Sequence, residues 1–381
     1  MKSFAFAYKF IDEEVKNIED SDTTAECHFN VWKVESRCFF SATTFFFDIG
    51  LKISSKVESV YAYIPFDFEE NEYQFDLAKK LQDCNQLLCT VFNADYKSEV
   101  GQGESITKVL DQGNKVQFYL MSLGSTKFKV ELFKKTNGTI GKLLKINLKR
   151  NIDLEEKAPI YIRFRLKAKK NQAIAISEHI SNDFLQAAFS KIDLFDFRIN
   201  EIRNINQDVM DRMRNDGYKT FYFDKVHLFY MADSREVIYN GSSLKQDARL
   251  LEQEFWFPYL PGDCRKTNFI AYHWKKRNPI DELKIDGSKI DKTQKFLKFP
   301  DYRIFFSSIY PRNQKIRLLV YLFVVILLSW SGSMLCFTLS HFLPFRLQEE
   351  YKAGLVLMMM MFVFIFFLYI NISVVIKIYK K

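Results

Sequence analysis

Two basic stretches contain the residues of this 381-residue chain that are best suited to bind an anion. Around residues 144–148 and 160–166, apolar side chains occupy every second position, which is typical of strands with one buried face. The basic side chains between them then lie on the opposite faces. If the two strands pair, they form a basic stripe that could bind the phosphates of a nucleotide, a nucleic acid or lipid headgroups. The stripe consists of Lys145, Lys149, Arg163, Arg165 and Lys167.

The competing interpretation of these residues is an ordinary solvated sheet face. The chain carries a formal net charge of +9, which is compatible with an anionic membrane surface, an acidic partner or a nucleic acid and distinguishes none of them. Aromatic side chains that could stack on bases are sparse near the stripe, where Tyr119 and Tyr161 are the candidates. We therefore expect an anionic ligand or a protein as the partner, and we do not expect a nucleic acid.

Histidine and cysteine residues do not form a recognisable metal motif. Cys27-His28 and the pair Cys84 and Cys89 are the close groupings, and neither has a second pair at the spacing of a zinc site. The other histidines before the apolar C-terminal end occur singly, at His179, His227 and His273. The sequence therefore predicts structural thiols and core or surface histidines, and no metal site.

Motifs of nucleophilic or phosphate-transfer catalysis are also missing from the sequence. Gly101-Gln-Gly103 lacks the third glycine of a dinucleotide-binding turn, and the sequence contains no Walker A pattern, no GxSxG and no HExxH. We therefore predict no catalytic residue and no cofactor. An enzyme with an unfamiliar site stays open as an alternative, because these motifs do not cover all chemistries.

The strongest sequence signal lies at the C-terminal end, where two long runs carry no charged side chain. They cover residues 318–339 and 353–376 and are separated by a polar turn that contains Pro344, Glu349 and Glu350. Because a helix rises about 1.5 Å per residue, each run can cross a hydrocarbon core of about 30 Å. Residues 317–381 are therefore predicted to form a hairpin of two transmembrane helices in a lipid bilayer.

Basic residues flank this predicted hairpin on both outer sides. They are Arg312, Lys315 and Arg317 before the first run and Lys377, Lys380 and Lys381 after the second. Lysine and arginine near the ends of spans are retained on the cytoplasmic side more reliably than acids are. We therefore expect an integral membrane protein with both termini in the cytoplasm, in the inner membrane if the cell is bacterial.

Small residues in the first predicted span could bring helices together. Ser329, Gly332 and Ser333 lie near its middle, and such residues let helix backbones approach closely. Asn371 in the second span could add an interhelical hydrogen bond. The contact joins either the two spans of one chain or several copies of the chain in a homo-oligomer. No charged residue lies within either span, which argues against a transporter relay.

Upstream of the hairpin, short runs rich in Phe, Tyr and Val predict a β-rich domain over residues 1–168. Alternating strands and a turn at Asn137-Gly138 predict that this domain is antiparallel and sandwich-like. Residues 169–274 mix helical and strand patterns and are predicted to form an α+β domain, followed by a polar linker and juxtamembrane segment at residues 275–316. The predicted fold class is thus α+β. Helices are expected at residues 75–84, 181–191, 207–214 and 244–255.

These features favour a non-enzymatic integral membrane protein in which a large cytoplasmic domain senses a ligand or binds a partner and is coupled to a two-helix anchor. The motivation is a large upstream region without a catalytic motif, attached to an apolar hairpin. Two alternatives belong to other classes. One is an oligomeric pore-forming or membrane-disrupting effector, with the layout that prokaryotic antiviral systems use. The other is a membrane-tethered enzyme that acts on a nucleotide or a lipid.

Overall fold

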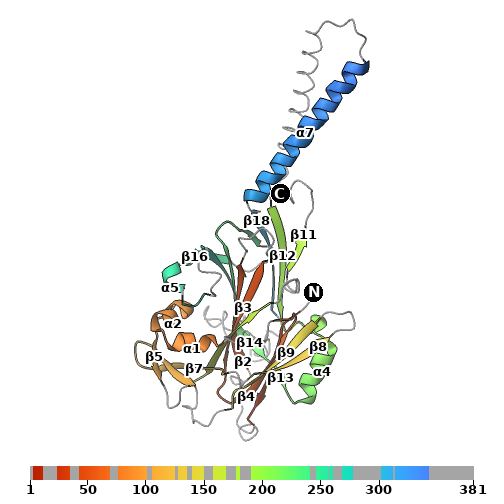
Figure 1. Cartoon of the computed structure of the whole chain (residues 1–381). Coiled ribbons are helices and arrows are strands. Elements are labelled where there is room, and N and C mark those ends of the chain that lie inside the picture. Colours follow the sequence, from red (N-terminus) through yellow and green to blue (C-terminus); the bar gives the residue numbers. More distant parts are fainter. Residues whose placement is uncertain are drawn as a thin grey trace, which may run out of the picture. The chain divides into compact units, whose positions relative to one another are not determined.

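The computed structural model describes most of the chain before residue 343 (Figure 1). The described residues are 3–11, 24–34, 43–68, 76–100, 105–124, 128–134, 140–149, 158–168, 177–180, 190–240, 246–256, 258–260, 268–277, 302–311 and 314–342. The chain divides into two compact units, Met1–Pro311 and Arg312–Lys381.

A mixed sheet of nine strands organises the first unit. Its strand order is β16-β17-β14-β2-β3-β10-β7-β6-β5. The strands are β2 (Thr24–Val34), β3 (Thr44–Ile53), β5 (Lys97–Val100), β6 (Ile106–Leu110), β7 (Val116–Met121), β10 (Ile160–Lys167), β14 (Tyr222–Asp233), β16 (Gln246–Leu250) and β17 (Phe269–Arg277). The pairs β2–β14 and β7–β10 are parallel. The predicted β-rich character is confirmed, and the predicted antiparallel arrangement holds for the other pairs of this sheet but not for these two.

Two smaller sheets contain the other described strands of this unit. The five-stranded sheet β13-β1-β4-β9-β8 consists of β1 (Ala5–Phe10), β4 (Val57–Ile64), β8 (Phe128–Lys134), β9 (Ile140–Asn147) and β13 (Lys219–Thr220). The four-stranded sheet β11-β12-β18-β15 consists of β11 (Ser177–Ile180), β12 (Ser190–Ile199), β15 (Val237–Asn240) and β18 (Tyr302–Pro311). Strands β8 and β9 pair as antiparallel neighbours, as predicted, and the predicted turn between them lies outside the described residues.

The helices in the described part of the first unit are short. They are α1 (Leu77–Gln82), α2 (Asn85–Phe92), η5 (Ile202–Asn204), α4 (Gln207–Asn215) and α5 (Gln253–Trp256). The side chain of Asp76 caps α1 by accepting hydrogen bonds from two backbone N–H groups. The side chain of Asn206 caps α4 by accepting one such hydrogen bond. The helices predicted near residues 75–84 and 207–214 are therefore confirmed.

One apolar core joins the three sheets. It takes Phe29 and Phe47 from the nine-stranded sheet, Phe6 from the five-stranded sheet and Phe306 from the four-stranded sheet. Aromatic rings are frequent in it, and Phe4 meets Phe29 edge to face with 4.7 Å between the ring centroids. Because buried apolar surface contributes about 25 cal/mol per Å² to folding, this shared core is what holds the sheets together.

Helices cover the opposite faces of the two larger sheets. Val209, Met210 and Met213 of α4 pack against the five-stranded sheet. On the nine-stranded sheet, a second apolar cluster unites α1, α2 and α5 with the sheet, for example through Leu81 and Leu88. Figure 1 shows these three helices gathered at one side of the unit. The sheet face beneath them carries the candidate functional site.

The boundary predicted near residue 168 does not separate two compact units. The nine-stranded sheet takes β2, β3 and β10 from one side of it and β14, β16 and β17 from the other. The predicted juxtamembrane segment also differs, because residues 302–311 form β18 and pair with β12 along their length. Residues 278–301, which hold most of the predicted linker, lie outside the described residues.

The helix predicted over residues 244–255 is wrong in most of its length. Residues 246–250 form β16 and pair with β17, and helical structure is confined to α5. The apolar spacing in this stretch is compatible with a helix and with a strand. Pairing with the edge of β17 stabilises the strand. Most of the helix predicted over residues 181–191 lies outside the described residues, and its last two residues belong to β12.

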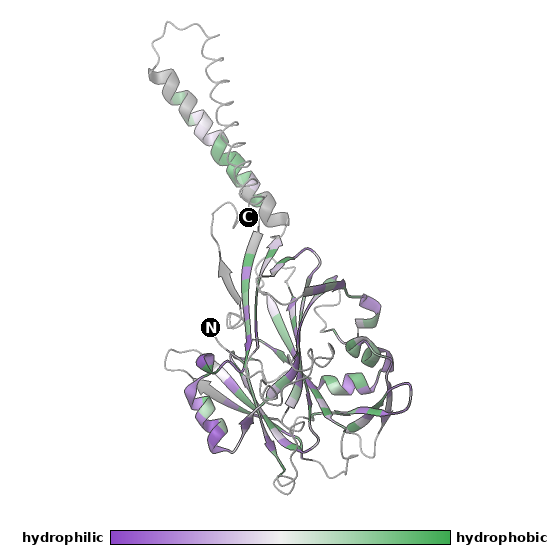
Figure 2. Cartoon of the chain, turned by 180° about the vertical axis from the view of Figure 1, so that it is seen from behind, coloured by the Kyte–Doolittle hydropathy of each residue, from purple (hydrophilic) through white to green (hydrophobic). Residues whose placement is uncertain are grey.

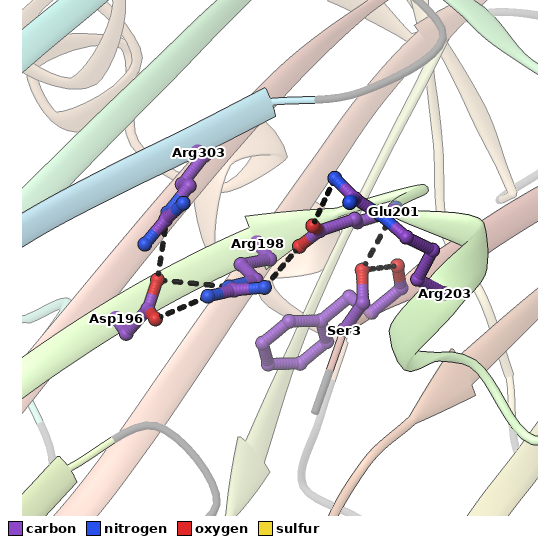
Figure 3. Close-up of polar contacts among 7 residues, drawn as sticks. Ser3, Asp196, Arg198, Glu201, Arg203 and Arg303 are labelled. Atoms are coloured by element: carbon purple, nitrogen blue, oxygen red, sulfur yellow. Dashed lines mark hydrogen bonds and ion pairs between the residues drawn. The ribbon is translucent and has the colours of Figure 1, made fainter. Parts of the chain in front are cut away.

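A network of charged groups ties the beginning of the chain to β12 and β18 (Figure 3). Arg198 donates to both carboxylate oxygens of Asp196, at 2.9 and 2.6 Å, and to Glu201 at 2.5 Å. Arg303 lies 3.4 Å from Asp196, and the Ser3 hydroxyl accepts a hydrogen bond from the backbone N–H of Glu201. Since Arg198 and Asp196 are buried, their bidentate contact satisfies charges that would be unfavourable alone.

The second unit contains helix α7 (Gln314–Phe342). Figure 2 shows apolar residues along its described part, and the side chains of Phe323, Ile326 and Trp330 are more than half exposed. A search of the described residues finds no helix that is both long enough and apolar enough to cross a membrane. The second predicted span, residues 353–376, lies outside the described residues.

Candidate functional site

A cavity of about 480 Å³ lies on the helix-covered face of the nine-stranded sheet. The polar part of its wall includes Glu26, His28, Asn30, Lys52, Arg163, His227 and His273. The apolar part includes Phe92, Phe118, Phe229, Met231 and Trp256. A cavity of this size and mixed character is typical of sites for small molecules, which span about 300–1,000 Å³.

Strand pairing brings the polar wall residues together. Glu26, His28 and Asn30 alternate along β2 with side chains that enter the shared apolar core, so they lie on the face that carries the cavity. His28 is in register with His227 of the parallel strand β14. On β17, His273 is in register with Phe229, which follows His227 by two residues on β14. Residues from opposite halves of the chain thereby become neighbours.

Glu26, His28 and His227 form the centre of the site. Oε1 of Glu26 lies 3.0 Å from Nε2 of His28 and 3.6 Å from Nε2 of His227. One ligand atom from each residue can be chosen so that all three lie within 4.8 Å of one another. Two imidazole nitrogens and one carboxylate are a ligand set that zinc and related metals use. These three residues are therefore the ones that could hold a metal ion.

A row of stacked rings extends from this cluster. Nδ1 of His227 lies 3.1 Å from Nε2 of His273. His273 in turn stacks on Phe229 with 4.1 Å between the ring centroids. The stacking fixes the plane of the imidazole rings, so the cluster is held in a defined orientation.

Tyr161 reaches the cluster across a glycine. Its hydroxyl lies 3.1 Å from Nδ1 of His28 and accepts a hydrogen bond of 2.8 Å from Arg163. Gly50 is paired with both His28 and Arg163 on the neighbouring strands, and a Cβ atom at this position would overlap the Tyr161 hydroxyl. Glycine at position 50 therefore leaves the room that the contact between Tyr161 and His28 needs.

A buried ion pair lies beside the cavity. Arg165 donates to both carboxylate oxygens of Asp48, at 2.5 and 2.8 Å, and Trp32 donates to the same carboxylate at 2.7 Å. Asp48 is fully buried. Burial raises the pKa of Asp48, but the charge and hydrogen bonds of Arg165 outweigh that effect and hold it below its usual value.

The histidines of the site are neutral at neutral pH. Burial lowers the pKa of His227 to about 3 and that of His273 to about 4. It also lowers the pKa of His28, against the opposing influence of Glu26. For Glu26, burial alone would raise the pKa, but the hydrogen bond with His28 and nearby ammonium groups lower it to about 2. The cluster therefore presents a carboxylate and imidazole lone pairs.

Two buried polar atoms of the wall residues have no partner in the described protein. They are Oδ1 of Asn30 and Nε1 of Trp256, and both side chains are only 4% exposed. Leaving such an atom unpaired is destabilising by about 1–3 kcal/mol. A bound molecule or a water is the usual partner of such atoms.

The five basic residues of the predicted stripe do not lie on one sheet. Lys145 belongs to β9 and Lys149 follows it, whereas Arg163, Arg165 and Lys167 belong to β10 of the nine-stranded sheet. The pairing on which the stripe depends is not formed, because β9 pairs with β4 and β8, and β10 pairs with β3 and β7. Arg163 and Arg165 are buried instead of solvated, and Arg163 lines the cavity.

Three histidines that lie far apart in the sequence, His28, His227 and His273, meet in this site. On β2, the polar residues Glu26, His28 and Asn30 alternate with apolar residues that enter the core. This alternation can be recognised in the sequence and predicts a strand with one polar face. The sequence contains no comparable signal that β14, which carries His227, lies beside β2. The reason is that the register between strands distant in sequence is decided by packing.

The small residues predicted to pack between helices lie on α7, where Ser329, Gly332 and Ser333 are exposed. The Ser333 hydroxyl donates to the carbonyl oxygen of Ser329, one turn earlier in the same helix. This bond is local to the helix. Asn371 lies outside the described residues, so helix packing, self-association and pore formation stay predictions.

The site can thus offer an anion a buried guanidinium, and it can offer a metal ion three ligand atoms. Comparison of the chain with models of known protein families finds no match, and a search of curated proteins finds no significant relative.

Proposed function

We propose that this protein is a membrane-attached receptor whose Met1–Pro311 unit binds a small organic anion in the cavity on the nine-stranded sheet. Arg163 carries this proposal, because it is 2% exposed and its hydrogen bonds go to the neutral hydroxyls of Tyr161 and Tyr259. It forms no ion pair with a described carboxylate. Asp48, whose charge acts on Arg163, is bound by Arg165. A buried cation is normally paired, and an anionic ligand would supply the missing partner.

Other wall residues define the kind of anion. Lys52 lines the cavity, with its ammonium group 5.5 Å from the centroid of the Phe118 ring. Burial lowers the pKa of Lys52, and a bound anion would raise it again by stabilising the ammonium form. Phe92 and Trp256 add apolar surface. We therefore infer a ligand with one acidic group, a carboxylate or phosphate, and a flat apolar part.

Membrane attachment is the second part of the proposal, and the C-terminal sequence supports it. The runs at residues 318–339 and 353–376 lack charged side chains, and basic residues flank them on both sides. The exposed apolar side chains of α7 would be unfavourable in water and favourable in lipid. The flanking charges favour a cytoplasmic location for the Met1–Pro311 unit.

Ligand binding is tested by native mass spectrometry of the full chain purified in mild detergent. We expect a bound organic anion in the wild type, lost in Arg163→Met and reduced in Lys52→Met, because both changes remove positive charge from the cavity wall. Lys149→Met is the matched control, since Lys149 is exposed and lies outside the cavity wall. Equal ligand occupancy in Arg163→Met and the wild type, with unchanged melting temperatures, would contradict the proposal.

Membrane attachment is tested by fractionating cells that express the full chain or a chain ending at Pro311. We expect the full chain to stay in the membrane fraction after alkaline extraction and the shortened chain to be recovered in the soluble fraction. The reason is that transfer of two uncharged runs of this length into lipid is effectively irreversible, unlike surface adsorption. Extraction of the full chain by alkali would show that the C-terminal part does not span the bilayer.

A membrane-tethered enzyme is a second candidate, and the cluster of Glu26, His28 and His227 favours it. Two histidines and one carboxylate also form the ligand set of catalytic zinc sites, which keep one position open for water or substrate. Conversion of the co-purified compound by the wild type, but not by Glu26→Gln, would distinguish the enzyme from the receptor.

A further inference from the structure

We propose that Glu26, His28 and His227 bind a divalent transition metal ion of the Zn²⁺ class, and that this ion is a contact point for the anionic ligand. The geometry of the three residues supports the metal site by itself. Its role toward the anion rests on the proposed function. The two parts can therefore fail separately.

The distances between the ligand atoms suit a tetrahedral ion. At metal–ligand bonds of about 2.0–2.1 Å, two ligand atoms of such an ion lie about 3.3–3.4 Å apart. Oε1 of Glu26 lies 3.0 Å from Nε2 of His28 and 3.6 Å from Nε2 of His227, on either side of that value. These two separations need a change of a few tenths of an ångström to reach it, and the three ligand atoms all lie within 4.8 Å of one another.

The three ligands lie on adjacent strands near the middle of the sheet. Glu26 and His28 are two residues apart on β2, so their side chains leave the same face. His227 is the register partner of His28 on β14. Ligands on paired strands are held more precisely than ligands on loops, so the site is preorganised.

Each histidine also has a partner for the ring nitrogen that would not bind the metal. Nδ1 of His28 lies 3.1 Å from the hydroxyl of Tyr161, and Nδ1 of His227 lies 3.1 Å from Nε2 of His273. With the ion bound, the ring proton of His28 resides on Nδ1 and is accepted by Tyr161, which leaves Nε2 free for the metal. Metal-ligating histidines almost always have such an outer partner.

An open coordination position fits the surroundings of the cluster. Three protein ligands leave one position of a tetrahedral ion for water or an acidic group, and the same cavity wall contains Arg163 and Lys52. Asn30 follows His28 on the same face, and its buried Oδ1 lacks a partner. A metal-bound water or a ligand hydroxyl is a donor of the kind that this oxygen lacks. The structure thus combines a ligand set with an unpaired buried acceptor next to it.

The test uses the full chain in mild detergent, stripped with a chelator and titrated with Co²⁺ alone. We expect one Co²⁺ per chain, with the visible absorption of a four-coordinate ion, no sulfur charge-transfer band, and displacement by one Zn²⁺. His28→Gln and His227→Gln should weaken binding by more than the about 10–100-fold expected for Tyr161→Phe, which removes only an outer partner. His179→Gln is the matched control, because His179 belongs to β11 of the four-stranded sheet and the three proposed ligands belong to the nine-stranded sheet.

Three outcomes decide the inference. If the stripped wild type takes up no stoichiometric Co²⁺ or Zn²⁺, or if Tyr161→Phe and His28→Gln bind as tightly as the wild type, the metal site is wrong. A rise in melting temperature on adding Zn²⁺ to the wild type, absent in the two histidine variants, supports the site even if those variants are less stable. If the co-purified anion binds equally well to stripped and loaded protein, the metal site stands and its role toward the anion is wrong.

Discussion

Replacing Arg165 with leucine is expected to lower the free energy of unfolding by about 3–5 kcal/mol at neutral pH. The change would leave the carboxylate of Asp48 fully buried, with the Trp32 indole as the donor that remains to it among the described side chains. An uncompensated buried charge is far less favourable than a buried pair, because the low-dielectric interior does not replace its lost hydration. The loss is measured by urea denaturation of the chain ending at Pro311, followed by its tryptophan fluorescence.

The pH dependence of that loss identifies its cause. In the wild type, the pKa of Asp48 is held below its usual value, so its stabilising effect is present above about pH 3.9 and is lost as the pH falls through the folded-state pKa. In Arg165→Leu, the unpaired buried carboxylate should instead have a raised pKa, and its penalty should vanish once it is protonated. The difference in stability between the two proteins should therefore shrink on acidification. A difference that does not change with pH would contradict this explanation.

A double variant is the matched control for the same pair. Asp48→Asn together with Arg165→Leu removes both charges and keeps an acceptor oxygen for Trp32. It should be more stable at neutral pH than Arg165→Leu alone, since no buried charge is left without a partner. If the double variant loses the sum of the two single changes, the residues act independently, and the ion pair is not the source of the effect.

Replacing Lys33 with methionine is the second change with a large expected effect, about 3–5 kcal/mol of lost stability. The Lys33 ammonium group lies 2.8 Å from the carboxylate of Asp193 and 3.0 Å from that of Glu236, and its side chain is fully buried. Tyr230 also donates to Glu236, at 2.8 Å. Methionine has a similar volume but cannot donate, so two buried carboxylates would lose the ammonium group that lies between them.

The position of Lys33 gives this change a structural signature. Lys33 belongs to β2 of the nine-stranded sheet and Asp193 to β12 of the four-stranded sheet, so the pair joins two sheets. Amide hydrogen exchange in Lys33→Met should therefore increase in β12 and β18 beyond the increase elsewhere in the unit. Arg212→Met is the matched control, because Arg212 makes an exposed ion pair, of a kind worth about 0–1 kcal/mol. Equal effects of the two changes would sink the prediction.

Both predictions concern polar groups inside a unit that is otherwise held together by apolar packing. Asp48, Arg163 and Arg165 lie under the helices that cover the nine-stranded sheet, a place where apolar side chains would be more stable in most proteins. Several buried polar groups close together are expected at binding sites, where they lower the stability of the fold but can bind a ligand. The stability tests thus also ask how much of this polar face is structural and how much serves a ligand.

Much of the local structure could be predicted because it depends on short-range patterns. The strands around residues 144–148 and 160–166 were identifiable from side chains that alternate between two faces, and α4 from apolar residues at helical spacing. The same rules failed over residues 244–255, where the apolar spacing is compatible with both a helix and a strand. There the edge of β17 selects the strand that becomes β16. Local patterns therefore identify elements well until a tertiary neighbour has to decide between two of them.

The candidate site is the part that local patterns could not supply. The alternation of Glu26 and His28 marks one polar face, but nothing near His227 or His273 in the sequence indicates that these residues lie beside it. Their proximity comes from the parallel pairing of β2 with β14 and from the packing of α2 and α5 over the sheet. Similarly, Arg163 appears in the sequence as a surface residue, because alternation alone does not show that helices cover its face.

The sequence by itself determined the strand-rich character of this protein, its basic charge and the two uncharged runs from which membrane attachment is inferred. These properties follow from composition and from periods of a few residues, which the chain carries wherever it folds. Only the tertiary structure decided which strands are neighbours, and thereby that one carboxylate and three imidazoles meet beside a buried guanidinium. The physical reason is that strand order and register depend on the packing of a whole core, to which residues from both halves of the chain contribute together.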